Sequence, residues 1–450
     1  MNGIDEIASL IVRLRTNDVA AATLDRLRLH VADSIGAWIA ATHSAEGKLL
    51  ISYRDRRRSG GRASGDSLAD DLATHCALAR LSEIDDIHLA SMTTPGSIVI
   101  PAAMTLAAAW LDADSGDVAA AMLAGYEAMI RLGLAVKGPN ILYRGIWPTY
   151  FVAGFASAAV AARLMRLDQR QTAQALALAL TMASPTVGQH HATTTARWFL
   201  AGNAARSGLT AASAAQAGFT ADTDVLQSRL FPDVYGIEPD LGAMSKAADG
   251  APALAQVSFK PWCAARQTMA ATQALREILD RGVSADEISE VAVYVPPPHL
   301  KMIDHGVQAG NRASFLTSLP YQLALAALRP DQMSDLDQPA DTALPPLQSF
   351  MAQVRVAGDE TLLADYPIAW PARVIVATSS GRHEQRVHDV PGDPARPFGE
   401  GDVHGKFRRC VARCLGDAEA ERLWQASLSV LRSRDALLSM MRDLDRVMSA

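Results

Sequence analysis

The sequence predicts a mainly α-helical protein: a large multi-helix domain, and a smaller α+β lid domain inserted before the C-terminal helices. Three observations support this prediction. From Ile4 to about Ala215, apolar residues recur at intervals of three and four, which is the period of a helix. After Lys260, β-branched runs bounded by proline and glycine indicate strands. Beyond Gly405 the pattern is helical again.

The first domain, predicted over residues 1–261, consists of alanine-rich helices. Alanine is a strong helix former with a small side chain, so these helices are expected to pack closely. The basic run Arg54–Arg58, followed by Ser59 and two glycines, is interpreted as a solvated loop. The main helices are expected at Ala102–Leu111, Val118–Leu132, Phe151–Leu164 and Thr172–Ala183.

The second domain is predicted over residues 262–395. A helix at Thr268–Arg281 is followed by a β-branched run, Ile288–Val295, that ends at three prolines, which cannot continue a ladder. Pro391–Gly405 is interpreted as a linker. The first domain is expected to be completed by residues 396–450. Further strands are expected at Phe350–Val356, Ala372–Thr378 and, after a turn, His383–Val390.

Composition narrows the possible functions. Apolar residues make up 49% of the 450 residues, which is enough for a large core, and the net charge of −6 does not favour nucleic acid as a partner. No segment resembles a signal peptide, and no run of about 20 uninterrupted apolar residues suggests a membrane span. The four dispersed cysteines are typical of a reducing compartment. Cys410 and Cys414 lie four apart without obvious further ligands, so no metal site is expected. We therefore expect a cytoplasmic protein.

An ordered set of short segments extends through almost the whole chain. The set comprises Asp33-Ser-Ile-Gly-Ala-Trp-Ile-Ala40, Glu83-Ile-Asp-Asp-Ile-His88, Pro95-Gly-Ser97, Gly125-Tyr-Glu127, Gly145-Ile-Trp-Pro-Thr149, Ala201-Gly-Asn-Ala-Ala-Arg-Ser-Gly208, Lys260-Pro261 and Ser318-Leu-Pro-Tyr321. In this order the segments resemble the MmgE/PrpD family, which includes 2-methylcitrate dehydratases, cis-aconitate decarboxylases and an iminodisuccinate epimerase. The resemblance implies a helical domain with an α+β lid, usually a homodimer, and proton transfer next to a carboxylate without a metal or other cofactor.

The resemblance also implies catalytic residues. Glu83, Asp85, Asp86 and His88 would form a polar wall that includes the base, although acids are also favoured in a helix cap and loop. Lys260 would bind a substrate carboxylate or act as a base if desolvated, the alternative being a surface lysine. Tyr321 would donate a proton to a leaving group or an enolate, the alternative being a core tyrosine.

The chain departs from the family pattern at several site positions. Thr94 and Trp147 stand where the family has histidine, Arg197 stands where it has lysine, and Ile87 replaces a threonine. Threonine cannot shuttle a proton near neutrality, and tryptophan offers a single donor. Arginine still holds a carboxylate but is a poor acid or base. His190 and His191 could supply the missing imidazole, or could serve in a loop or cap. We assign substrate binding to Thr94, Trp147, Arg197 and these two histidines.

Together these observations predict a cofactor-independent lyase acting on a small di- or tricarboxylic acid. An epimerase or isomerase on the same scaffold, and a non-catalytic relative that binds a ligand, are the alternatives. Because Trp147 changes the shape of the pocket, 2-methylcitrate and cis-aconitate are expected to be poor substrates.

Overall fold

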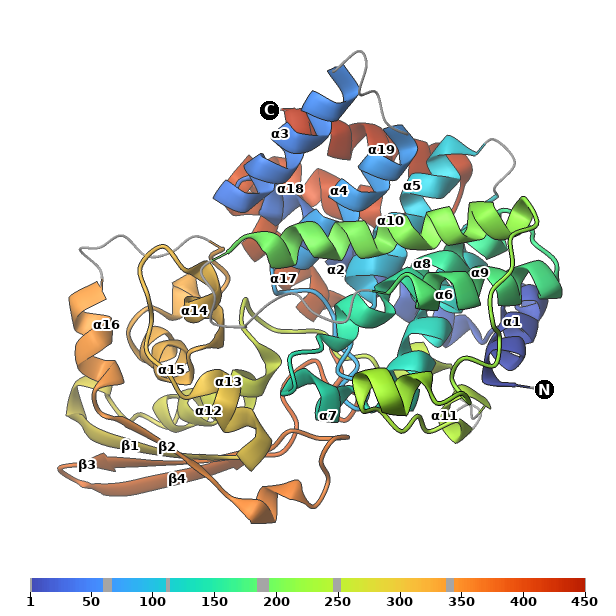
Figure 1. Cartoon of the computed structure of the whole chain (residues 1–450). Coiled ribbons are helices and arrows are strands. Elements are labelled where there is room, and N and C mark those ends of the chain that lie inside the picture. The colour runs from blue at the N-terminus through green and yellow to red at the C-terminus, as the bar shows by residue number, and fades with distance from the viewer. Residues whose placement is uncertain are drawn as a thin grey trace. The chain divides into compact units, whose positions relative to one another are not determined.

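The computed structural model describes residues 2–59, 67–110, 114–183, 194–245, 252–336 and 344–449, which divide into two compact units. The first unit is built from the described residues of Met1–Gly188, Thr195–Phe259 and Gly399–Ala450. The second contains Lys260–Phe398. Helices dominate and the strands form a single small sheet in the described part of the chain (Figure 1), so the predicted mainly α-helical fold is confirmed.

The first unit is entirely helical in its described elements. The sequence predicted four of these helices individually, at Ala102–Leu111, Val118–Leu132, Phe151–Leu164 and Thr172–Ala183. The described helices of the unit follow in chain order. They are α1 (Gly3–Arg13), α2 (Ala21–Thr42), α3 (Ala45–Ser59), α4 (Ser67–Leu81), α5 (Gly96–Ala109), α6 (Ser115–Ala135), α7 (Gly138–Leu142), α8 (Pro148–Leu164), α9 (Gln169–Thr181), α10 (Ala196–Gln216), α11 (Gly242–Ser245), α17 (Glu400–Leu415), α18 (Asp417–Ser427) and α19 (Arg434–Ser449).

Small residues allow the long helix α10 to pack tightly against α4 and α8 (Figure 1). A Cβ atom added to Gly202 would lie 2.1 Å from the carbonyl oxygen of Ala73, and one added to Gly208 would lie 2.3 Å from that of Gly154. The backbones therefore touch at these crossings, which is the close packing expected from the small residues of these helices.

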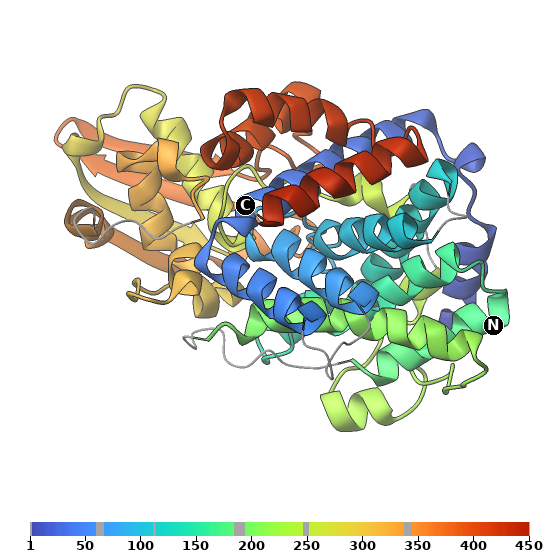
Figure 2. The ribbon, with the colours of Figure 1, turned by 90° about the horizontal axis from the view of Figure 1, so that it is seen from above.

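The C-terminal helices pack on the N-terminal part of the same unit (Figure 2). The Lys406 ammonium in α17 lies 2.6 Å from Asp33 Oδ1 in α2, and both side chains are buried. The predicted linker Pro391–Gly405 is wrong at its end, because α17 begins at Glu400. There the Gly399 N–H donates to the Asp402 side chain and caps the helix.

The interpretation of the basic run as a solvated loop is wrong. Residues 54–58 belong to α3, and carboxylates of the neighbouring helix α4 pair with two of its four arginines. Arg57 pairs with Asp70, and Arg58 pairs with Asp71. The two glycines that suggested a loop, at positions 60 and 61, lie outside the described residues.

The second unit is a four-stranded sheet with helices against it, in the strand order β2-β1-β3-β4. Strands β1 and β2 are parallel, while β1–β3 and β3–β4 are antiparallel. Helix α12 packs on β1, β3 and β4, and α15 packs on α12 (Figure 1). The elements are α12 (Arg266–Leu279), β1 (Ile288–Val295), α13 (Leu300–Ile303), α14 (Arg312–Thr317), α15 (Leu319–Leu328), α16 (Leu344–Met351), β2 (Val354–Gly358), β3 (Ala372–Thr378) and β4 (Gly381–Val387).

Two of the four predicted strands have the predicted bounds, and two do not. The strand expected at His383–Val390 is β4, which runs from Gly381 to Val387. β1 and β3 match because proline and glycine end their β-branched runs sharply. The strand expected at Phe350–Val356 starts only at Val354, since Phe350 lies in α16, where it is buried. A short apolar run has no periodicity of its own to distinguish a helix end from a strand.

Among the described residues, one helix, α6, is long and apolar enough to cross a membrane by length and composition. Its most apolar window is 94% buried inside the structure, as expected of a core helix.

Candidate active site

The acidic segment lies in the loop between α4 and α5, within the first unit. α4 ends at Leu81, and Glu83 adopts a left-handed conformation with φ of 56°. Short β-bridges pair Ile87 with Ser258 and His88 with Thr93. The loop is therefore held at both ends, and its polar side chains are buried.

Two arginines hold the carboxylates of this loop. Arg80 Nη1 lies 2.9 Å from Glu83 Oε2 and 3.2 Å from Asp85 Oδ1. Arg197 Nη2, from α10, lies 3.3 Å from Glu83 Oε1. Because the four side chains are buried, the attraction between them is only weakly screened by water. This arginine pair with its carboxylates is the charged centre of the candidate site.

The N-terminal end of α8 lies beside both arginines. The Arg197 guanidinium lies 4.3 Å from the centre of the Trp147 ring, and that of Arg80 lies 5.8 Å from the Tyr150 ring. The Tyr150 hydroxyl is buried and has no hydrogen-bond partner in the described part of the chain. A buried phenol without a partner is costly unless a ligand supplies one.

Hydroxyl groups gather where α5 and α8 begin. The Thr94 N–H donates to Thr149 Oγ1 over 3.1 Å, and the two hydroxyl oxygens lie 3.2 Å apart. Thr94 lies two residues before α5, and Thr149 is in the first turn of α8. Helix N-terminal ends carry partial positive charge and favour anions. Thr94 therefore lies in surroundings suited to a carboxylate.

Asp86 is anchored by three donors. Its Oδ2 lies 2.9 Å from His30 Nδ1 and 2.7 Å from the Tyr126 hydroxyl, while its Oδ1 accepts from the Gly96 N–H over 2.7 Å. A carboxylate with its oxygens occupied in this way is better suited to fix the start of α5 than to remove a proton from a substrate.

The His88 side chain is hydrogen-bonded to Ser91 within the same loop. The Ser91 N–H donates to His88 Nδ1 over 3.2 Å, so this nitrogen is an acceptor and the proton of the neutral ring lies on Nε2. Burial lowers the pKa of His88 to about 4. At neutral pH His88 is therefore an uncharged hydrogen-bond donor.

Lys260 and Tyr321 belong to the second unit. Lys260 is 2% exposed, so the alternative of a surface lysine is wrong. Tyr321, in α15, packs edge-on against Phe315 with ring centres 5.1 Å apart, and burial raises its pKa to about 12. The burial of Tyr321 is compatible with both of its predicted roles, a proton donor and a core tyrosine.

The two adjacent histidines, His190 and His191, lie outside the described residues. Sequence reasoning missed Arg80 and Tyr150. Arg80 is three residues before Glu83, and Tyr150 follows the Pro148-Thr149 pair. Those local signals were available but are too common to select a residue without the fold.

Comparison with known proteins relates both units to one family. Residues 5–240 match the MmgE/PrpD N-terminal domain, and residues 262–430 match the MmgE/PrpD C-terminal domain. The chain is also similar to two curated proteins named cis-aconitate decarboxylase, from Aspergillus terreus and from Aspergillus terreus strain NIH 2624 / FGSC A1156. Each is 28% identical over 253 residues, which is 52% of this chain and 51% of the relative. The similarity thus spans about half the length of these relatives.

Proposed function

Because the chain belongs to the MmgE/PrpD family, we propose that it is a cofactor-independent lyase that acts on a small di- or tricarboxylic acid. The observation that carries this proposal is the buried arginine pair, Arg80 and Arg197, around Glu83. Arginine matches the planar geometry of a carboxylate and binds it with two parallel hydrogen bonds. Glu83 shows that these guanidinium groups accept a carboxylate in this position.

The proposed reaction begins with removal of a proton from the carbon next to a substrate carboxylate. The negative charge then spreads onto that carboxylate, where the arginines and the helix N-terminal ends stabilise it. For a dehydratase, a hydroxyl on the next carbon leaves with a proton as water. For a decarboxylase, no proton is removed first. The bond to one carboxylate carbon breaks, carbon dioxide leaves, the electron pair stays on the remaining carbon, and that carbon receives a proton.

We propose Asp85 as the base, since both oxygens of Asp86 and both oxygens of Glu83 are already paired. The phenol of Tyr150 is a proton donor within the same unit. We propose that Lys260 binds a substrate carboxylate or removes a proton, and that Tyr321 donates a proton, as the resemblance implies.

Incubation of the full chain with di- and tricarboxylic acids in deuterated water, followed by proton NMR, separates the three possible functions. A lyase forms an unsaturated or decarboxylated product. An epimerase exchanges the proton next to the carboxylate for deuterium without elimination. A ligand-binding relative perturbs the resonances of the acid but never consumes it, and this result would contradict the proposal.

The variant Arg197→Gln tests the carboxylate-binding role. It removes one charged donor, and we expect kcat/KM to fall about 100-fold. Arg206→Gln is the matched control, because Arg206 lies on the same helix and pairs with Asp70. Wild-type turnover by Arg197→Gln would contradict the assignment, and an equal loss in the control would indicate a general effect on α10.

The proposal also concerns which acids are substrates. The Trp147 ring, buried under the Arg197 guanidinium, fills space where the family pattern has the smaller imidazole of histidine. We therefore expect 2-methylcitrate and cis-aconitate to be poor substrates, even though the similar Aspergillus proteins are named for the latter. Rapid turnover of either acid at high concentration would refute this expectation.

A further inference from the structure

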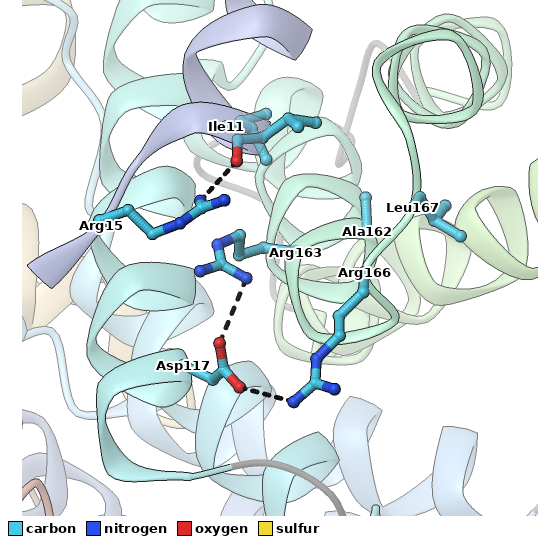
Figure 3. Close-up of a pocket in the computed structure, with 8 residues that line it drawn as sticks. Ile11, Arg15, Asp117, Ala162, Arg163, Arg166 and Leu167 are labelled. Carbon is cyan, nitrogen blue, oxygen red and sulfur yellow. Dashed lines mark hydrogen bonds and ion pairs between the residues drawn. The ribbon is translucent and has the colours of Figure 1, made fainter.

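A cavity of about 330 Å³ opens in the first unit where α1, α6 and α8 meet (Figure 3). Its lining combines three arginines, Arg15, Arg163 and Arg166, with one acid, Asp117. Apolar side chains, including Ile11 and Leu167, form other parts of the wall. No residue of the candidate active site takes part in this lining.

The described lining of this cavity is rich in arginine. Asp117 Oδ1 lies 3.3 Å from Arg163 Nη1, and Asp117 Oδ2 lies 3.1 Å from Arg166 Nη2, so one carboxylate serves two guanidinium groups. Arg15 donates to the backbone carbonyls of Val12 and Leu14, over 2.6 and 3.0 Å. Among the described residues that line the cavity, three side chains are therefore positive and one is negative.

Arg163 is placed unfavourably for a structural residue alone. Its side chain is 11% exposed, and its Nε atom is buried with no hydrogen-bond partner among the described residues. Burial lowers its pKa, Asp117 acts in the opposite direction, and Arg15 and Arg166 lower it further.

We infer that this cavity is a binding site for a small organic anion with at least two negative charges, of the polycarboxylate or phosphate-ester class. The arginines would bind its oxygens in pairs, and Ile11 and Leu167 would contact its carbon skeleton. Such a ligand would bring negative charge to this arginine-rich lining and would accept a hydrogen bond from the buried Nε of Arg163.

The cavity is separate from the candidate active site. Trp147 precedes the first residue of α8, and Arg163 lies near its last. At 1.5 Å per residue along the helix, the two positions are roughly 24 Å apart. A ligand in the cavity therefore does not compete directly for the arginine pair Arg80 and Arg197.

Titration calorimetry on the full chain at constant ionic strength, with citrate and with pyrophosphate as probes, tests the inference. We expect Arg166→Gln and Arg15→Gln each to raise the dissociation constant about tenfold or more, since a charged hydrogen bond is lost. The affinity should also fall as salt is added. Both arginines lie near the surface, so the variants should fold, which circular dichroism verifies.

Two control variants distinguish this cavity from other sites. Arg229→Gln removes an arginine that is 82% exposed and pairs with Asp233 four residues on, so it should leave binding unchanged. Arg197→Gln removes carboxylate binding at the candidate active site, and binding at the cavity should persist in it.

Binding of citrate alone or of pyrophosphate alone would assign the ligand to one of the two classes. The inference is overturned if neither probe binds, if the cavity variants bind as well as the wild type, or if Arg229→Gln loses affinity equally.

Discussion

Replacing Lys406 with methionine should destabilise the first unit by roughly 3–5 kcal/mol at pH 7.5, the usual cost of breaking a buried ion pair. Lys406 Nζ lies 2.6 Å from Asp33 Oδ1 and donates to the Ile84 carbonyl oxygen over 2.7 Å. Methionine fills a similar volume but supplies no donor. The variant therefore leaves a buried carboxylate without its cation and a buried carbonyl without its hydrogen bond.

The size of this effect follows from the contact itself. Two unit charges 2.6 Å apart attract by about 6 kcal/mol at an effective dielectric constant of about 20. Part of this attraction offsets desolvation, which leaves the range given above. At about 2.1 cal/mol/K of unfolding entropy per residue, a unit of roughly 300 residues should lose about 5–8 °C in Tm.

The pH dependence identifies the group responsible. Burial raises the pKa of Asp33 to about 6, although Lys406 acts in the opposite direction. A carboxyl with a raised pKa binds more protons in the folded state, so its contribution to stability is largest at low pH and is lost as pH rises toward 6. Without Lys406 this pKa should rise further. The cost of Lys406→Met should therefore be smaller at pH 5 than at pH 7.5.

Urea unfolding followed by tryptophan fluorescence, at both pH values, measures the effect. The double variant Asp33→Asn/Lys406→Met removes the stranded charge and should recover more than half of the lost stability at pH 7.5. A loss below 1 kcal/mol, or a double variant no better than the single one, would refute the reasoning.

Three other predictions concern packing, protonation and thiol exposure. Gly202→Ala places a Cβ atom 2.1 Å from the Ala73 carbonyl oxygen, so it should lower the free energy of unfolding by roughly 3 kcal/mol or more. The urea midpoint measures this loss, and near-wild-type stability would contradict the close packing of α10 on α4. The pKa of His88 is lowered to about 4, so the protein should lose up to about 3 kcal/mol as pH falls from 6.5 to 4. His88→Gln should flatten this part of the stability curve, and an unchanged slope would count against it. Only Cys414 is partly exposed, so a thiol reagent should label it alone in the native protein, and two fast-reacting thiols would be inconsistent with the fold.

Much of the fold could be predicted because it depends on local patterns. Helical periodicity located α6, α8 and α9 to within three residues and α5 to within six, and proline and glycine bounded β1 and β3. The basic run of α3 was misassigned because the acids that pair with two of its arginines, Asp70 and Asp71, come from the next helix. A pairing of that kind is visible only after the helices have packed.

The sequence by itself determined the helical domain, the small sheet and the family to which the chain belongs. It also identified Trp147 and Arg197 as departures from the family pattern. The roles within the acidic segment were decided by the tertiary structure. The Asp86 carboxylate is hydrogen-bonded to His30, which is 56 positions away in the sequence. The Glu83 carboxylate is paired with Arg197, which is 114 positions away. Protonation and hydrogen bonding depend on burial and on partners distant in the chain, and local sequence carries no record of either.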